Sequence, residues 1–239
     1  MADGNTEESI KNLLICTKNA PASFECWQQL IQVLVQVGDY DRLRIHSARA
    51  LDYFPDQPFF YLYLGIGQLS LGYYSEAIQA LKSGLLYIVD NPFLESQFYF
   101  NLGEAYFKNK DKFNCYKYFE KTIALDQNNR FALHNYSYYL ALNNDSLNLA
   151  DVLIKKCISL DFANPNYYYT QALILFKLNE FNQAKVMLSK AFNIAGESNY
   201  VWCELYGDIL KRLGNLIEAR KYWERSINLG NKNLDLNTK

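Results

Sequence analysis

Small and apolar residues recur along the chain about every 34 residues, and each period contains two consecutive helical patterns. The first helix of each period carries a marker position, which is usually occupied by a small residue. The markers are Ile31, Gly65, Gly103, Ser137, Ala172 and Gly207, separated by steps of 34, 38, 34, 35 and 35 residues. Self-similarity at this period indicates a solenoid of stacked helix pairs.

The second helix of each period carries a triplet at positions i, i+4 and i+7, which share one helical face. From the second period onward the triplet reads small, large, small, as in Ala77/Leu81/Gly84, Cys115/Phe119/Thr122 and Ala219/Trp223/Ser226. Small residues let two helix backbones approach closely, and the large residue fills the space between them. We therefore expect the two helices of each pair to pack through these positions.

Gly, Asn and Asp residues fall between the two helices of each period, where tight turns favour them. The predicted helix pairs are 24–37/40–53, 58–71/74–89, 94–109/112–125, 129–142/146–159, 165–178/181–195 and 199–213/216–229. The step of 38 residues, which ends near Pro92, predicts either a longer second helix or an enlarged loop. The expected organisation is a tail and half-repeat helix over 1–23, six repeats over 24–229 and a polar tail over 230–239, too short for a capping helix.

These residues resemble the tetratricopeptide repeat, whose pattern is W-x2-L-G-x2-Y, then A-x3-F-x2-A, then P. The first period begins Trp27-x2-Leu30, and the third reads Tyr99-x-x-Leu102-Gly103-x-x-Tyr106. Two departures are local: Ile31 replaces the first glycine, and the fourth period has one extra residue before Ala150. The resemblance implies an all-α fold, a right-handed superhelical solenoid of about six helix pairs preceded by one extra helix.

The last two periods are similar to the C-terminal repeats of tetratricopeptide proteins from Gram-negative bacterial envelopes, many of which are lipoproteins. The similarity covers Leu173-x-Leu175-Phe176 and Glu204-x-Tyr206-Gly207-Asp208 together with the residues after each. It implies a periplasmic or outer-membrane-associated protein whose signal lies outside this chain, and the alternative is a cytoplasmic protein. No apolar run reaches the ~18 residues that a transmembrane helix needs.

Charge and composition argue against several classes of function. With 24 basic and 25 acidic residues the net charge is −1, which argues against nucleic-acid binding and against RNA-binding helical repeats, which are usually basic. The five cysteines form no C-x-x-C pair, and we expect them to be buried thiols that fill helix contacts. Two histidines and five cysteines show no catalytic or metal-ligand spacing, so we predict no catalytic residue, no metal site and no cofactor.

The resemblance implies that the fifth, sixth, ninth and thirteenth positions of each repeat face a concave groove. The candidate groove residues are Gln32, Tyr63, Asn101, Glu104, Lys108, His134, Asn135, Tyr138, Tyr169 and Thr170. The cationic set that clamps acidic C-termini in chaperone-binding members is absent. The remaining aromatic and amide groups suit an extended peptide held by stacking and backbone hydrogen bonds.

The alternative role for the aromatic candidates is packing between helices. It stays open for Tyr63, Tyr138 and Tyr169, and it is the expected role of Tyr167 and Tyr168. The predicted function is a non-catalytic scaffold that binds a partner protein or an extended peptide in the concave groove. The alternative function is self-association into a homo-oligomer through uncapped ends.

Overall fold

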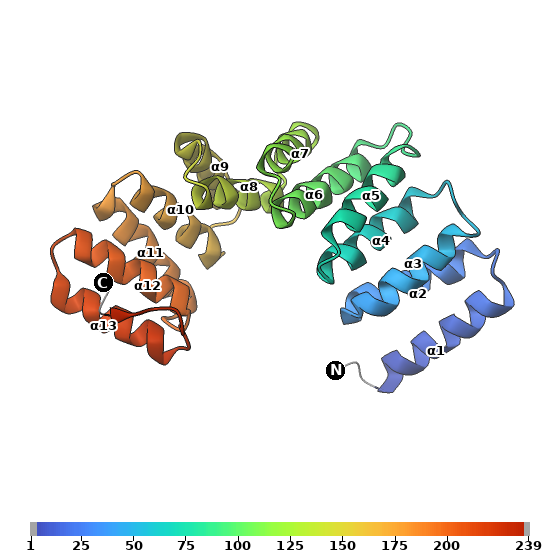
Figure 1. The fold of residues 1–239 in the computed structure, drawn as a ribbon, viewed down its shortest axis with the longest axis horizontal. Helices are drawn as coiled ribbons and strands as arrows, with labels where there is room; N and C mark the ends of the chain where they lie inside the picture. The colour runs from blue at the N-terminus through green and yellow to red at the C-terminus, as the bar shows by residue number, and fades with distance from the viewer. Residues whose placement is uncertain (1–3, 237–239) are drawn as a thin grey trace. The chain divides into compact units, whose positions relative to one another are not determined.

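The computed structural model describes residues 4–236, and these residues form thirteen α-helices that pack as adjacent pairs (Figure 1). The helices are α1 (Gly4–Asn19), α2 (Phe24–Val37), α3 (Tyr40–Leu51), α4 (Pro58–Ser70), α5 (Tyr74–Leu85), α6 (Pro92–Lys108), α7 (Lys112–Leu125), α8 (Arg130–Leu142), α9 (Leu147–Leu160), α10 (Pro165–Lys177), α11 (Phe181–Ala195), α12 (Tyr200–Arg212) and α13 (Leu216–Asn228). None of these helices is long and apolar enough to cross a bilayer.

The chain divides into two compact units, and the boundary between them in the sequence falls between Gln127 and Asn128. The N-terminal unit contains α1 and the pairs α2/α3, α4/α5 and α6/α7, and the C-terminal unit contains the pairs α8/α9, α10/α11 and α12/α13. Each unit has its own apolar core. In the N-terminal unit, part of the core lies between α1, α2 and α3, where Ile10, Leu30 and Leu43 are fully buried.

The turn inside each of the six pairs has the same geometry. One residue lies in the left-handed region at each turn, and these residues are Gly38, Gly72, Lys110, Asn144, Asn179 and Gly214. The following N–H then donates to a carbonyl five residues back, as from Tyr73 to Gln68 at 2.9 Å. This is the Schellman arrangement, which satisfies carbonyls at the end of the first helix and starts the return of the chain. The turns predicted from the sequence are therefore confirmed in all six pairs.

The marker positions meet the large residues of the triplets, as the sequence pattern predicts. A Cβ atom added to Gly207 would lie 2.4 Å from Cδ1 of Trp223, and one added to Gly103 would lie 2.9 Å from Cε2 of Phe119. Such distances leave no room for a side chain on the marker residue. Glycine thus permits the close approach of the two helices in each of these pairs.

The linker between the second and third pairs corrects one prediction. The second helix, α5, ends at Leu85 and not at residue 89, so the enlarged loop is correct and the longer helix is wrong. The helix after the loop begins early, because Asn91 accepts a hydrogen bond from the Leu94 N–H at 3.0 Å and Pro92 occupies its first turn. Asp90 adopts a left-handed φ of 48° just before this cap.

The cysteines correct a second prediction, because they are not all thiols. Cys16 in α1 and Cys26 in α2 form a disulfide, with Cα atoms 5.9 Å apart. The chain turns back after α1, and the end of α1 thereby lies beside the start of α2, at the usual Cα separation of disulfides. Cys115, Cys157 and Cys203 are buried free thiols, as expected. Burial raises the pKa of Cys115 to about 12 and that of Cys157 to about 11.

The segment after α13 packs back onto the C-terminal unit. Asn231 is buried, and its Nδ2 donates to Glu204 Oε2 at 2.9 Å and to Ser226 Oγ at 3.0 Å. Leu234 and Leu236 are partly buried against the core of this unit. The predicted polar tail therefore includes a short segment that covers part of the last helix pair.

Candidate functional site

Five of the ten candidate groove residues lie in the N-terminal unit. They are the exposed Gln32 on α2, Tyr63 on α4, and Asn101, Glu104 and the exposed Lys108 on α6. Tyr63 packs on Phe59 of its own helix, with ring centroids 4.7 Å apart. Asn101 donates from Nδ2 to the carbonyl of Gln97, also on its own helix, at 2.8 Å. Tyr63 is also partly buried against the apolar core of the N-terminal unit, which supports its alternative role in packing.

Four of the other five candidates lie around one cavity in the C-terminal unit. This cavity has a volume of about 270 Å³ and lies between α8, α10 and α12. Its lining residues are His134, Tyr138, Asn166, Tyr169, Thr170, Asn199, Val201 and Trp202. Asn135, the fifth candidate in this unit, is partly buried and is not among these lining residues.

Three aromatic rings follow one another along the cavity, one from each helix. The centroid of the Tyr138 ring lies 6.4 Å from that of Tyr169, and the Tyr169 ring stacks on Trp202 at 5.8 Å with an interplanar angle of 18°. We call Tyr138, Tyr169 and Trp202 the aromatic row. Burial raises the pKa of the Tyr138 and Tyr169 hydroxyls, so both remain protonated donors at neutral pH.

His134 supplies a neutral polar group beside the aromatic row. Its Nε2 lies 3.0 Å from the Thr170 hydroxyl, which is itself buried. Burial lowers the pKa of His134 to about 4, and a hydrogen bond with Asn135 opposes that shift. The imidazole is therefore uncharged at neutral pH, and the His134–Thr170 pair fixes its orientation.

Two exposed asparagines mark the rim of the cavity. Asn166 lies in the first turn of α10, and Asn199 caps α12 by accepting hydrogen bonds from the Val201 and Trp202 N–H groups at 2.9 and 3.3 Å. Capping uses the carbonyl oxygen of Asn199, which leaves its amide N–H groups for other acceptors. None of the eight lining residues carries a charge at neutral pH, so the cavity offers stacking surfaces and hydrogen bonds.

The described residues also bear on metal chemistry. Within residues 4–236, no three His, Cys, Asp or Glu side chains lie close enough together to hold a metal ion.

A family model described as the tetratricopeptide repeat matches residues 96–129 and 165–198, which cover most of the third helix pair and all of the fifth. The chain therefore contains tetratricopeptide (TPR) repeats. Repeats of this family generally mediate protein–protein interactions and are typically not catalytic. A search of curated protein sequences finds no match to the chain.

Several solved structures share the fold. YrrB, described as a TPR protein with an unusual peptide-binding site, is 17% identical with a TM-score of 0.60, covering 77% of this chain and 92% of its own. PilF of Pseudomonas aeruginosa is 16% identical with a TM-score of 0.71, covering 87% of this chain and 92% of its own. A chain of the APC/C hetero-tetramer Cut9–Hcn1 is 12% identical with a TM-score of 0.68, covering 94% of this chain and 43% of that chain.

Four residues that line the cavity were not predicted from the sequence: Asn166, Asn199, Val201 and Trp202. The groove positions expected from the TPR family begin at the fifth residue of a repeat, whereas Asn166, Val201 and Trp202 are second or third residues and Asn199 directly precedes its repeat. One signal was available, because Asn166 and Val201 occupy the same repeat position, 35 residues apart. Tyr167 and Tyr168, which were expected to pack between helices, are indeed buried.

Proposed function

We propose that this TPR protein is a non-catalytic interaction scaffold, and that its C-terminal unit holds an extended segment of a partner protein along the aromatic row. The observation that carries the proposal is the spacing of the rings. Successive centroids in the row are 6.4 and 5.8 Å apart. Two residues of an extended chain advance about 6.4–6.8 Å. Every second side chain of a bound peptide would therefore contact a new ring.

The polar groups of the cavity suit a peptide backbone. An asparagine amide can donate to a carbonyl and accept from an N–H, so Asn166 can recognise a peptide backbone without regard to its side chains, and Asn199, whose oxygen caps α12, can donate to a backbone carbonyl. Because the lining side chains are uncharged, ion pairs contribute little, and we expect the affinity to change little with salt concentration. A cavity that recognised an acidic peptide through charge would behave in the opposite way.

Site-specific photocrosslinking tests the proposal directly. A photoreactive amino acid replaces Asn166 or Val201 at the cavity, and in a matched control it replaces Val186, an exposed residue of α11 in the same unit. After irradiation in an extract of the native source, mass spectrometry identifies the crosslinked peptides. We expect one partner segment to be crosslinked from both cavity positions and not from Val186. Equal crosslinking from Val186, or none from the cavity, would contradict the proposal.

Self-association is the second candidate function, and α13 supports it. Leu216 and Ile217 lie at its start and are 60% and 79% exposed, so an apolar patch remains on the last helix pair. Light scattering over a dilution series separates the two functions. A monomer at every concentration would exclude self-association, and a dimer that dissociates in a Leu216→Glu variant would support it.

We further infer that the protein works in an oxidising compartment, as an envelope protein would. The supporting observation is the Cys16–Cys26 disulfide, because disulfides persist outside the reducing cytosol. Thiols are trapped under denaturing conditions during lysis of the native source, so that buried thiols also react, and each cysteine is then assigned by mass spectrometry. Protection of Cys16 and Cys26 alone is the expected result, and full trapping of both would exclude the inference.

A further inference from the structure

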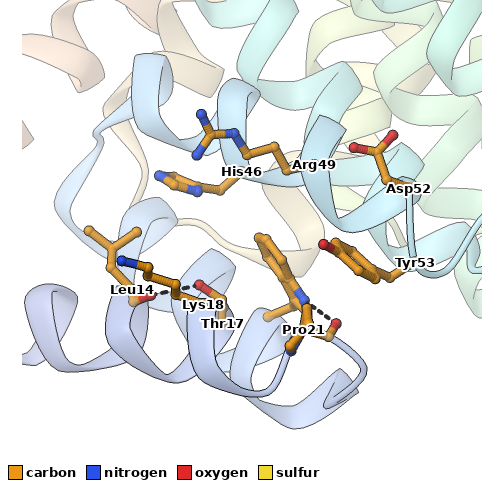
Figure 2. Close-up of a pocket in the computed structure, with 9 residues that line it drawn as sticks. Leu14, Thr17, Lys18, Pro21, His46, Arg49, Asp52 and Tyr53 are labelled. Carbon is orange, nitrogen blue, oxygen red and sulfur yellow. Dashed lines mark hydrogen bonds between the residues drawn. The ribbon is translucent and has the colours of Figure 1, made fainter.

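A second cavity lies in the N-terminal unit, and none of the candidate groove residues lines it. It has a volume of about 490 Å³ and lies where the end of α1 faces α2 and α3 (Figure 2). Its walls come from Thr17 and Lys18 of α1, Trp27 of α2, and His46 and Arg49 of α3. The cavity is larger than the one beside the aromatic row, and its chemistry differs because charged side chains line it.

Two cations on different helices flank the cavity. Lys18 belongs to the last turn of α1 and Arg49 to the last turn of α3, and both side chains are exposed. Among the described residues, neither forms an ion pair. Asp52 also lines the cavity, so the three charged side chains sum to one positive charge. This balance suits a singly charged anion better than a dianion.

His46 is a buried polar group with an unfilled hydrogen-bonding position. The residue is 9% exposed, and its buried Nδ1 has no hydrogen-bond partner among the described residues. Burial lowers the pKa of the imidazole, and the nearby charges of Arg49 and Arg42 act in the same direction, against Asp39. Figure 2 shows the Arg49 guanidinium beside the His46 ring. A buried group of this kind gains free energy when a ligand atom completes its hydrogen bonds.

An aromatic wall forms the other side of the cavity. The rings of Trp27 and Tyr53 stack at 6.1 Å with an interplanar angle of 28°. Trp27 is buried, and its Nε1 donates to the Pro21 carbonyl at 2.9 Å, which fixes the indole in place. Tyr53 is 51% exposed, so its ring remains open to a ligand. This wall offers a surface for an apolar or aromatic group.

The walls of the cavity are held together at both ends of α1. Near the cavity, the disulfide joins Cys16 to Cys26, which precede Thr17 and Trp27 directly. At the other end of α1, Glu7 accepts two hydrogen bonds from the Arg42 guanidinium at 2.7 and 3.1 Å. The cavity is therefore preformed, and a ligand would not have to order it first.

We propose that this cavity binds an organic carboxylate, with the carboxylate between Lys18 and Arg49 and the apolar body of the ligand against Trp27 and Tyr53. A second hydrogen bond joins the ligand to His46. Two sources share this chemistry: the C-terminal residue of a peptide that ends in an aromatic side chain, and a free aromatic carboxylic acid. The site lies apart from the aromatic row, so it would be occupied independently of a segment held there.

Calorimetric titration with three probes tests the proposal: a pentapeptide ending in phenylalanine with a free carboxylate, the same peptide with a C-terminal amide, and phenylacetate. We expect the amidated peptide to bind about tenfold more weakly than the free acid, since it loses charge-assisted hydrogen bonds. Arg49→Gln and Lys18→Gln should weaken the free acid by a similar factor. Lys11→Gln, which changes an exposed lysine on α1 outside the cavity, should leave the affinity unchanged.

The relative affinities of the three probes identify the source of the carboxylate, and they can also disprove the site. Phenylacetate binding as tightly as the free-acid peptide would identify a small-molecule site, and tighter binding of the peptide would identify a C-terminus site. Equal affinities for the free acid and the amide would overturn the proposal. So would the absence of binding by either acid at millimolar concentration, or unchanged affinity in Arg49→Gln and Lys18→Gln proteins that melt as the parent does.

Discussion

Replacing Gly207 with alanine tests the close contact between α12 and α13. The new Cβ would lie 2.4 Å from both Cδ1 and Nε1 of Trp223, and 3.0 Å from the carbonyl oxygen of Ala219. The indole cannot move freely, because it is buried and its Nε1 donates to Asp208 Oδ1 at 3.0 Å. The variant must therefore displace the ring or separate the two helices.

Three effects determine the expected change in the free energy of unfolding, and one of them is stabilising while two are destabilising. In an unconstrained helix, replacing glycine with alanine stabilises the helix by about 1 kcal/mol. Overpacking of a well-packed contact costs about 1–3 kcal/mol. Weakening the hydrogen bond between Trp223 and Asp208 costs about 1 kcal/mol more. Gly207→Ala should therefore lower the free energy of unfolding by about 1–3 kcal/mol, the reverse of its effect at a site with free space.

The fifth helix pair provides a control for this prediction. At the same two repeat positions, the fifth pair has Ala172 and Leu188, so alanine is accommodated when the facing residue is leucine. We expect Gly207→Ala to be nearly neutral in a Trp223→Leu background. Urea denaturation of the parent, both single variants and the double variant measures the coupling between the two positions. An equal cost of Gly207→Ala in both backgrounds would refute the contact described here.

Three further predictions concern cysteine, histidine and asparagine side chains. Cys115 and Cys157 are buried with raised pKa values, so maleimide should label them slowly until denaturant is added; rapid stoichiometric labelling of the folded protein would contradict their burial. Burial lowers the pKa of His134 from 6.5 to about 4, so the unfolded chain binds a proton that the folded chain does not. Stability should therefore fall by up to roughly 3 kcal/mol as the pH drops from 6.5 to 4, and His134→Gln should flatten that part of the pH profile in thermal melts. Alanine at Asn101 or Asn135, which occupy the same repeat position but do not line the cavity of the aromatic row, should leave the affinity for a segment held there within about twofold of the parent. A calorimetric loss of about tenfold or more in either variant would contradict the placement of the segment on the aromatic row.

Much of the fold could be predicted from the sequence because a TPR array is built from local contacts. The contact of Gly207 with Trp223 lies within one repeat, and the 16-residue spacing of the two positions shows the pairing directly. The end of α5 could not be predicted in the same way. The apolar Ile88 and Val89 extend the helical pattern, and the cap formed by Asn91 decides against it.

The cavity was harder to predict than the helices. Its aromatic row joins side chains from three successive repeats, and repeat positions alone identified Tyr138 and Tyr169. Trp202 lies outside the expected positions, and only the packing of α12 on α10 brings it to the row. The disulfide between Cys16 and Cys26 likewise depends on how the chain turns back between α1 and α2, which no spacing motif records.

The central claim is that the aromatic row holds an extended peptide, and calorimetry with the segment identified by crosslinking tests it most directly. Tyr169→Ala should weaken binding at least tenfold, since a stacked ring contributes about 1.5–3 kcal/mol. Tyr169→Phe, which keeps the ring, should bind nearly as the parent does. Tyr200→Ala, which removes an exposed tyrosine of α12 outside the cavity, should stay within twofold. Parental affinity in a folded Tyr169→Ala protein, or an equal loss in Tyr200→Ala, would contradict the account.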